Sequence, residues 1–247
     1  MPADRLPRRD LLRLAGLGIL SAGLTACSSS ASVATPTTLL PPPASPEPTT
    51  EPAIAGPDEA LARLREGNQR FVADKEGHPN SSPSRRTTVA AGQQPFATIL
   101  GCVDSRVPPE LIFDRGLGDL FVIRTAGHTL DRAVTGSIEF GAAELKIPLI
   151  LVLGHERCGA VKATIDFLGG SGEAPGDIAM LVEAITPAVE AARARPGDLL
   201  DNAVEINVTR TIAALKTSSV LAELIAQGKA KITGAVYDLD TGAVRFL

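Results

Sequence analysis

The sequence predicts an α/β fold, with a mainly parallel β-sheet flanked by helices. Short apolar runs at 96–103, 120–123 and 149–153 have the length and the near-continuous hydrophobicity of strands buried on both faces. Segments with helical spacing lie between and after these runs, and strands that alternate with helices are typical of a parallel sheet. The roughly 190 residues at 58–247 suffice for one such domain with a full core.

The helices and strands of this domain are expected in a definite order. Asp58 is the expected N-cap of a first helix that carries Leu61, Leu64 and Phe71, and a polar loop extends through 79–84. The first two strands follow, and a helix at 132–145 then leads to the third strand. The remaining expected elements are helices at 158–168, 178–193 and 204–215 and a terminal hairpin of strands at 231–238 and 243–246.

The first 26 residues differ from the rest of the chain and are typical of a signal peptide. Arginines at 5, 8, 9 and 13 precede an apolar run that is too short to span a bilayer comfortably. The run ends in Leu24-Thr25-Ala26-Cys27, which resembles a bacterial lipobox and implies cleavage before Cys27 and a lipid on its thiol. Arg8-Arg9 resembles a twin-arginine export signal. We expect export and lipid anchoring to the outer face of the cell membrane, and an uncleaved membrane anchor is the alternative.

Residues 27–57 are expected to form a linker behind the lipidated Cys27. The stretch after Cys27 is mostly Ser, Thr, Pro and Ala, and such a composition cannot bury a core. If it is extended like polyproline, its roughly 30 residues reach up to about 90 Å. We interpret it as a disordered tether between the lipid and the folded domain, and a glycosylated spacer is compatible with the same composition.

Composition and charge exclude several classes of function. The net charge is −4 and the charged residues are not clustered, so nothing indicates a nucleic-acid partner. Aromatic residues make up 3% and Trp is absent, which argues against a stacking platform for bases or sugars. The chain has 3 cysteines, and this odd, small number argues against a disulfide framework.

Polar, metal-binding side chains follow two of the predicted strands. Cys102 lies at the end of the first predicted strand, and His155 and Cys158 follow the third in a His-x-x-Cys spacing. Sites in open parallel sheets form outside the carboxyl ends of the strands, so the three side chains can meet in one crevice. Thiolate and imidazole are zinc ligands, and a catalytic zinc site keeps one position open. The sequence therefore predicts a Zn²⁺ site in which the fourth position is open or filled by a carboxylate.

Asp104 and Arg106 are placed to act beside this metal. Residues i and i+2 point the same way at a strand end, and the arginine fork can clamp the carboxylate. Zinc lowers the pKa of bound water to about 7. Asp104 is expected either to accept a hydrogen bond from that water or to bind zinc itself. The alternatives are simple packing of the cysteines and a structural ion pair for Asp104 with Arg106.

The combination of Cys102-x-Asp104-Ser105-Arg106 with His155-x-x-Cys158-Gly159 resembles the signature of the β-class carbonic anhydrases. Further motifs that resemble this family are Gly-Asn-Gln-Arg-Phe at 67–71, Gly-Asp-Leu-Phe-Val-Ile-Arg at 118–124 and Ala-Gly at 126–127. The resemblance implies reversible hydration of CO2 to bicarbonate by zinc-bound hydroxide, with the Asp–Arg dyad orienting the water. It also implies a homodimer with exchanged N-terminal helices, or a higher homo-oligomer.

The same resemblance implies a substrate pocket. The backbone N–H of Gly159 matches the group that binds the substrate oxygen, and Gln93 matches a glutamine of the plant-type active site. Phe121 and Ala126 match apolar pocket walls, and Phe140 stands where plant-type enzymes have tyrosine. A tryptophan typical of the bicarbonate-inhibited subclass is replaced by Ile99, so the chain resembles the plant-type subclass.

Two other functions fit the same residues. One is hydrolysis of a CO2 analogue, carbonyl sulfide or carbon disulfide, with the same metal ligands. The other is a non-catalytic surface lipoprotein that binds zinc or bicarbonate, which an intact Asp104–Arg106 pair argues against. His128 can act as a proton relay, since imidazole titrates near neutrality, but its loop position favours a surface or capping role.

Overall fold

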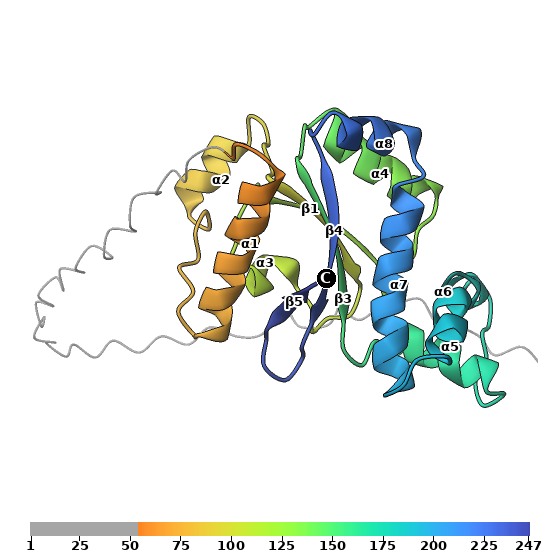
Figure 1. Ribbon diagram of the computed structural model, residues 1–247. Helices are drawn as coiled ribbons and strands as arrows, with labels where there is room; N and C mark the ends of the chain where they lie inside the picture. The colour runs from red at the N-terminus through yellow and green to blue at the C-terminus, as the bar shows by residue number, and fades with distance from the viewer. Residues whose placement is uncertain (1–53) are drawn as a thin grey trace, which may run out of the picture. The chain divides into compact units, whose positions relative to one another are not determined.

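Residues 54–247 build a sheet flanked on both faces by helices (Figure 1). The structure is a computed structural model and describes these residues, so the predicted signal peptide, Cys27 and most of the predicted linker lie outside them. The strands are β1 Ala97–Cys102, β2 Leu120–Thr125, β3 Leu149–His155, β4 Lys231–Tyr237 and β5 Val244–Phe246. Their order in the sheet is β2-β1-β3-β4-β5, with β1 to β4 parallel and β5 antiparallel to β4. The mainly parallel sheet and the terminal hairpin predicted from the sequence are confirmed.

The helices lie on the two faces of the sheet and beside Cys102 at the carboxyl end of β1. Helices α1 Pro57–Val72 and α3 Pro109–Ile112 cover one face, and α4 Arg132–Ala143, α7 Leu199–Leu215 and α8 Ser219–Ala226 cover the other (Figure 1). Helices α5 Gly159–Leu168 and α6 Ile178–Ala192 pack with α7 around the buried residues Cys102 and Cys158. The remaining elements are α2 Pro83–Val89 and the 3₁₀ turn η1 Ala126–His128.

The strands β1 and β3 are buried along their whole length, and their side chains alternate between two cores. Ile99 and Leu151 pack with Leu64 of α1 on one face. Leu100 and Ile150 pack on the other face against α4, α7 and α8. Because helices cover both faces, a continuous apolar run is required in these strands. This is the physical origin of the hydrophobic pattern in the sequence.

The start of the domain differs from the prediction. Asp58 is not the N-cap of α1: the helix begins at Pro57 after Gly56, and proline suits this position because its missing N–H would have no partner there. Asp58 lies in the first turn and forms an ion pair with Lys231 Nζ at 2.8 Å. The loop predicted at 79–84 ends in a helix instead, because α2 begins at Pro83 and the Ser82 hydroxyl accepts a bond from the Arg85 N–H.

Helix boundaries later in the chain also shift. The helix predicted at 204–215 begins at Leu199, because the Asp198 carboxylate accepts from the Asp201 N–H and caps it there. The sequence analysis did not predict α3 or α8, which are short and sit between stronger patterns. None of the helices in 54–247 has both the length and the apolar composition of a membrane span.

Candidate metal centre and active site

The candidate site lies where the strand order of the sheet reverses. From β1 the chain moves to β2 on one side and later returns as β3 on the other side of β1. Such a switch point opens a crevice at the carboxyl ends of the two strands. Cys102 is the last residue of β1, His155 is the last residue of β3, and Cys158 immediately precedes α5. The topology thus brings together side chains that are far apart in sequence.

The ligand atoms of Cys102, His155 and Cys158 lie within 4.8 Å of one another, and all three residues are buried. The two sulfurs are 4.0 Å apart. His155 Nδ1 lies 2.8 Å from the carbonyl oxygen of Glu156, so Nδ1 carries the proton and donates it. The lone pair of Nε2 is then free, and this buried atom has no hydrogen-bond partner within the described chain. A set of two sulfurs and one imidazole oriented by its other nitrogen fits zinc.

The pKa values of the two cysteines shift in opposite directions. A hydrogen bond from the Cys158 thiol lowers the pKa of Cys102, and the backbone N–H of Gly127 also donates to the Cys102 sulfur at 3.3 Å. The same interaction raises the pKa of Cys158. These directions favour a thiolate at Cys102 over one at Cys158, and a metal that binds both sulfurs displaces the Cys158 proton.

Asp104 presents a fixed carboxylate to this cluster. Arg106 donates to both of its oxygens, from Nε at 3.0 Å and from Nη2 at 2.8 Å, and the Arg106 backbone N–H donates at 3.0 Å. These bonds from Arg106 hold the pKa of Asp104 well below its usual range. Asp104 Oδ2 lies 3.9 Å from His155 Nε2. The carboxylate is therefore ionised, oriented and adjacent to the candidate ligand atoms.

Arg124 supports this loop, and the sequence analysis did not assign it a role. From β2 its guanidinium donates to the carbonyl oxygens of Cys102 at 2.7 Å and Asp104 at 2.6 Å. Arg124 pairs with Gly101 in the parallel register, so it lies one residue before the end of β1. An arginine inside an otherwise apolar strand pattern was the available signal.

Two predicted pocket residues lie at the cysteines. Gly159 is the first residue of α5, directly after Cys158, and a side chain built on it would meet no atom within 4 Å. Its backbone N–H belongs to the first helical turn, where amides lack helical partners. Ala126 opens the turn whose next residue, Gly127, donates to the Cys102 sulfur.

The other three predicted pocket residues lie away from the cysteines of their own chain. Gln93 is exposed and precedes β1, so it sits beyond the end of the strand opposite Cys102. Phe121 pairs with Thr98 in the register and its ring packs beside Gly141 of α4. Phe140, also on α4, is 50% exposed. Within one chain, these side chains do not line the crevice at Cys102, and their assignment to substrate stays a prediction.

The position of His128 differs from the surface or capping role expected from the sequence. It is 1% exposed rather than on the surface, because the turn η1 inserts it under α7, where its ring contacts the Asn207 amide. Desolvation lowers its pKa to about 4, so the imidazole is neutral at pH 7. Burial and neutrality at pH 7 argue against the proton relay considered from the sequence.

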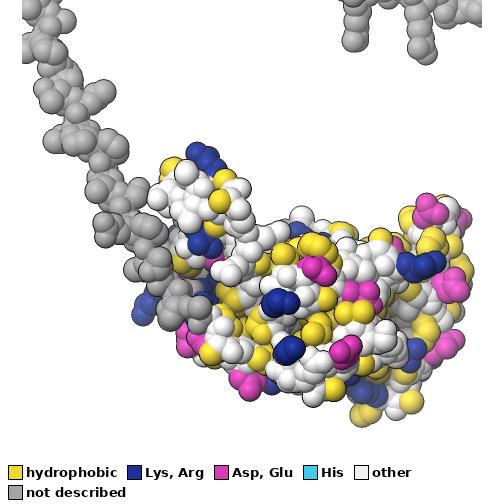
Figure 2. Space-filling model, turned by 90° about the horizontal axis from the view of Figure 1, so that it is seen from above, with side chains coloured by type: hydrophobic (Ala, Val, Ile, Leu, Met, Phe, Trp, Pro, Cys, Tyr) yellow, Lys and Arg dark blue, Asp and Glu magenta, His cyan; other side chains and the backbone are white. Residues whose placement is uncertain are grey.

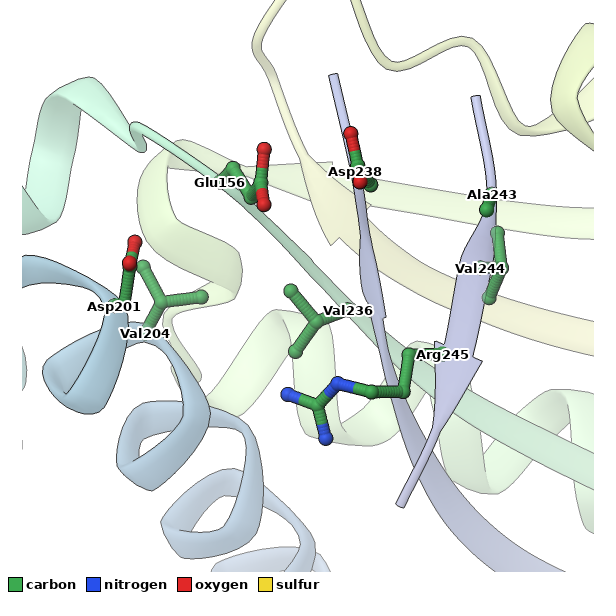
Figure 3. Close-up of a pocket in the computed structure, with 8 residues that line it drawn as sticks. All are labelled: Glu156, Asp201, Val204, Val236, Asp238, Ala243, Val244 and Arg245. Atoms are coloured by element: carbon green, nitrogen blue, oxygen red, sulfur yellow. The ribbon is translucent and has the colours of Figure 1, made fainter. Parts of the chain in front are cut away.

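A separate pocket of about 310 Å³ lies between α7 and the β4–β5 hairpin (Figure 3). Glu156 and Asp238 project at one end of it, and Arg245 reaches in from β5. Arg245 pairs with Glu205 at 2.7 Å. None of the predicted catalytic or substrate residues lines this pocket, so it is distinct from the candidate metal centre.

Known proteins of one family match most of the described chain. The model of the carbonic anhydrase family matches residues 97–244, from the start of β1 into β5. Carbonic anhydrase 2 of Mycobacterium tuberculosis is 46% identical over 187 residues, which cover 75% of this chain and 90% of that protein. The carbonic anhydrase of Mycolicibacterium smegmatis is 44% identical over 192 residues, covering 77% and 93%.

Among solved structures, the β-carbonic anhydrase CcaA superposes with a TM-score of 0.60 at 28% identity, covering 75% of this chain and 94% of that one. A parallel sheet with a Cys–His–Cys cluster at its switch point and these relatives together define the class: the chain belongs to the carbonic anhydrase family. Its fold places it in the β class of that family, and it is an enzyme.

Proposed function

We propose that this protein catalyses the reversible hydration of CO2 to bicarbonate and a proton at a zinc ion held by Cys102, His155 and Cys158. The observation that carries the proposal is the buried Nε2 of His155, which has no partner in the described chain and lies close to two cysteine sulfurs. Thiolate ligands favour zinc over Mg²⁺ or Ca²⁺, which take oxygen ligands. The names of the relatives support the carbonic anhydrase reaction.

The residues around the cluster have distinct roles in this proposal. When bound, zinc supplies a Lewis acid that lowers the pKa of water toward neutrality. Asp104 accepts a hydrogen bond from the attacking water and so orients it toward the carbon. Arg106 keeps the carboxylate ionised. The N–H of Gly159 donates to an oxygen of the substrate, and Ala126 lines the pocket beside it.

Asp104 is better suited to hold water than to bind zinc itself. Both of its oxygens already accept hydrogen bonds from the Arg106 guanidinium. Moving an oxygen into a metal's ligand sphere would weaken this bidentate pair, which is among the stronger polar contacts in proteins. We therefore infer that the dyad remains paired during turnover.

We also infer that the enzyme acts as a homo-oligomer with plant-type pockets shared between copies. Gln93, Phe121 and Phe140 line a crevice only if a second copy presents them, since they lie away from Cys102 in their own chain. Apolar side chains gather on the surface among charges of both signs (Figure 2). Large exposed apolar side chains include those of Val103, Leu111 and Phe140.

For the N-terminal segment we propose export by the twin-arginine route and anchoring to the outer face of the cell membrane through a lipid on Cys27. The order of arginines, apolar run and lipobox supports this proposal. The linker at 28–57 then separates the lipid from the catalytic domain.

Metal analysis and stopped-flow CO2 hydration on the purified enzyme test the function, with carbonyl sulfide as a rival substrate. We expect about one equivalent of zinc per chain, as one open Cys2His site predicts. Alanine at Cys102, His155 or Cys158 removes most of the zinc and the activity. Full zinc occupancy in all three variants would overturn the ligand assignment. Faster turnover of carbonyl sulfide than of CO2 would move the function to the hydrolase alternative.

A further inference from the structure

The Cys102 sulfur receives a hydrogen bond from a turn that is itself held from a distant helix. The donor is the backbone N–H of Gly127, at 3.3 Å from the sulfur. Gly127 and His128 belong to η1 and are both buried. A hydrogen bond to a thiolate withdraws charge from it, and partners outside the ligand set tune a metal site in this way.

Asn207 of α7 holds this turn through two hydrogen bonds from one amide nitrogen. Its Nδ2 donates to the Gly127 carbonyl oxygen at 2.9 Å and lies 3.1 Å from His128 Nε2. The amide has two hydrogens and each finds one acceptor, so Nε2 accepts and the imidazole proton is on Nδ1. Asn207 is 5% exposed, so water does not compete for these bonds.

The turn needs such support because its backbone conformation is unfavourable. His128 has φ 46° and Gly127 has φ 63°, both in the left-handed region. A residue other than glycine is disfavoured there, because its Cβ comes too close to the following carbonyl oxygen. The turn is also confined by packing: a Cβ on Gly127 would come within 2.7 Å of Ile185 Cδ1 and 3.3 Å of Ala160 Cβ. The N–H direction at Gly127 is therefore set jointly by α5, α6 and α7.

We propose that Asn207 and His128 are positioning residues of the metal centre, which keep the Gly127 N–H on the Cys102 sulfur and thereby set zinc retention. The proposal rests on the zinc site proposed above. Neither side chain touches the reacting atoms, and their effect reaches the metal through one backbone amide and one sulfur. Loss of such an outer partner typically costs about 10–100-fold in metal affinity.

The test compares variants of the full-length enzyme that remove the donor or the acceptor. Asn207→Ala removes both bonds, and Asn207→Asp keeps the shape but places an acceptor against two acceptors. His128→Leu cannot accept the hydrogen bond from the Asn207 amide. In His128→Gln, the side-chain amide oxygen can take the place of Nε2 as the acceptor. Thr211→Val is the matched control, since Thr211 is a buried polar residue one turn along α7 that donates no hydrogen bond to the described turn.

Two measurements report on the metal independently of activity. The first is the rate at which zinc passes to a competing chelator, which we expect to rise about 10–100-fold in both Asn207 variants and in His128→Leu. The second is the thiolate-to-metal charge-transfer absorption of the Co²⁺-substituted protein. It should move to lower energy in these variants, because a sulfur without its hydrogen bond is more easily oxidised. His128→Gln and Thr211→Val should stay close to wild type in both.

Unchanged zinc release and an unchanged cobalt spectrum in the folded Asn207 variants would overturn the proposal. A fall in thermal stability without either change would overturn it as well, since it would show a purely structural role. If an Asn207 variant does not fold, the His128→Leu and His128→Gln pair decides the question, because both carry the same backbone strain. A wild-type protein that binds no zinc would instead defeat the zinc site itself.

Discussion

At the scale of the residue, Asp104 shows how a partner fixes both the charge and the direction of a side chain. Arg106 donates three hydrogen bonds to this carboxylate, counting the backbone N–H. The pKa of Asp104 is therefore below its usual range, and the carboxylate is lost only when the pH falls through that lowered value. At neutral pH it is an acceptor and never a donor, as the proposed role beside the attacking water requires.

Replacing Asp104 by asparagine should impair CO2 hydration without removing the zinc. Asp104→Asn is expected to retain zinc, because the three ligands are untouched, but to lose about 10²–10⁴-fold in CO2 hydration, the usual cost of removing a positioned acid–base group. The amide presents a donor where the water needs an acceptor, and it leaves Arg106 without its partner. Zinc content and stopped-flow rates on the same preparation measure the two effects.

Asp240→Asn is the control for this prediction. Asp240 makes the same bidentate pair with Arg157, at 2.8 Å for both bonds, but its side chain is 72% exposed and lies outside the cluster. We expect near wild-type turnover, since an exposed pair contributes little to stability. Comparable losses in the two variants would contradict a specific role for Asp104.

At the scale of the element, the seating of α1 on the domain depends on a glycine. A Cβ on Gly67 would lie 1.9 Å from the carbonyl oxygen of Phe113, which is backbone and cannot rotate away. Asn68, the next residue, donates from its amide to the carbonyl oxygens of Ile112 at 3.2 Å and Gly242 at 2.8 Å. Helix α1 therefore approaches the end of α3 and the terminal hairpin at backbone distance.

Because of this close approach, we expect two glycine-to-alanine changes in helices to have opposite effects on the free energy of unfolding. Gly67→Ala should lower the free energy of unfolding by about 1–3 kcal/mol or more, because the methyl group overpacks a contact with backbone. Gly136→Ala in α4 should raise it by about 0.5–1 kcal/mol, because helix propensity improves. Gly136 is exposed and a Cβ there would meet no atom within 4 Å.

Urea unfolding of both variants checks the pair. The midpoint urea concentration and the slope of the free energy against urea are compared together, because a changed slope indicates a change in the denatured state. A stabilising Gly67→Ala would mean that α1 can move away from Phe113 at little cost, and would contradict the close seating described above.

At the scale of the whole molecule, the chain joins a catalytic domain to an N-terminal segment of very different composition. The domain contains the described site, and the sequence before residue 58 contains the proposed export signal and linker. Cysteine chemistry connects the two halves. In an oxidising compartment Cys102 and Cys158 can pair with each other, and a metal bound to both sulfurs before export protects them.

Cys27→Ser should release the protein from membranes, because a serine hydroxyl cannot form the thioether to the lipid. Fractionation of cells that make each form, with radiolabelled fatty acid, measures both anchoring and modification. CO2 hydration by the released form should equal that of wild type. A Cys27→Ser protein that stays with the membrane would show that the apolar segment itself is the anchor.

Much of the fold, and the meeting of Cys102, His155 and Cys158 at one end of the sheet, was predictable from the sequence because both follow from local patterns. Strands β1 and β3 are buried on both faces, so their apolar runs were visible, and Cys102 and His155 end them. The short helix α8 was not predicted, since eight residues carry too little periodicity. Asp58 was assigned as a cap from its type alone, and the proline before it decided where the helix begins.

Sequence patterns alone were enough to predict the mainly parallel sheet, the proximity of the two cysteines to His155 and the pairing of Asp104 with Arg106, because each depends on strand ends or on a short spacing. The tertiary structure alone decided that His128 is buried and that Asn207, 79 residues away, holds it. It also decided that Gln93, Phe121 and Phe140 lie away from the cysteines of their own chain. Such contacts depend on how helices pack over a sheet, and neither residue type nor spacing records that packing.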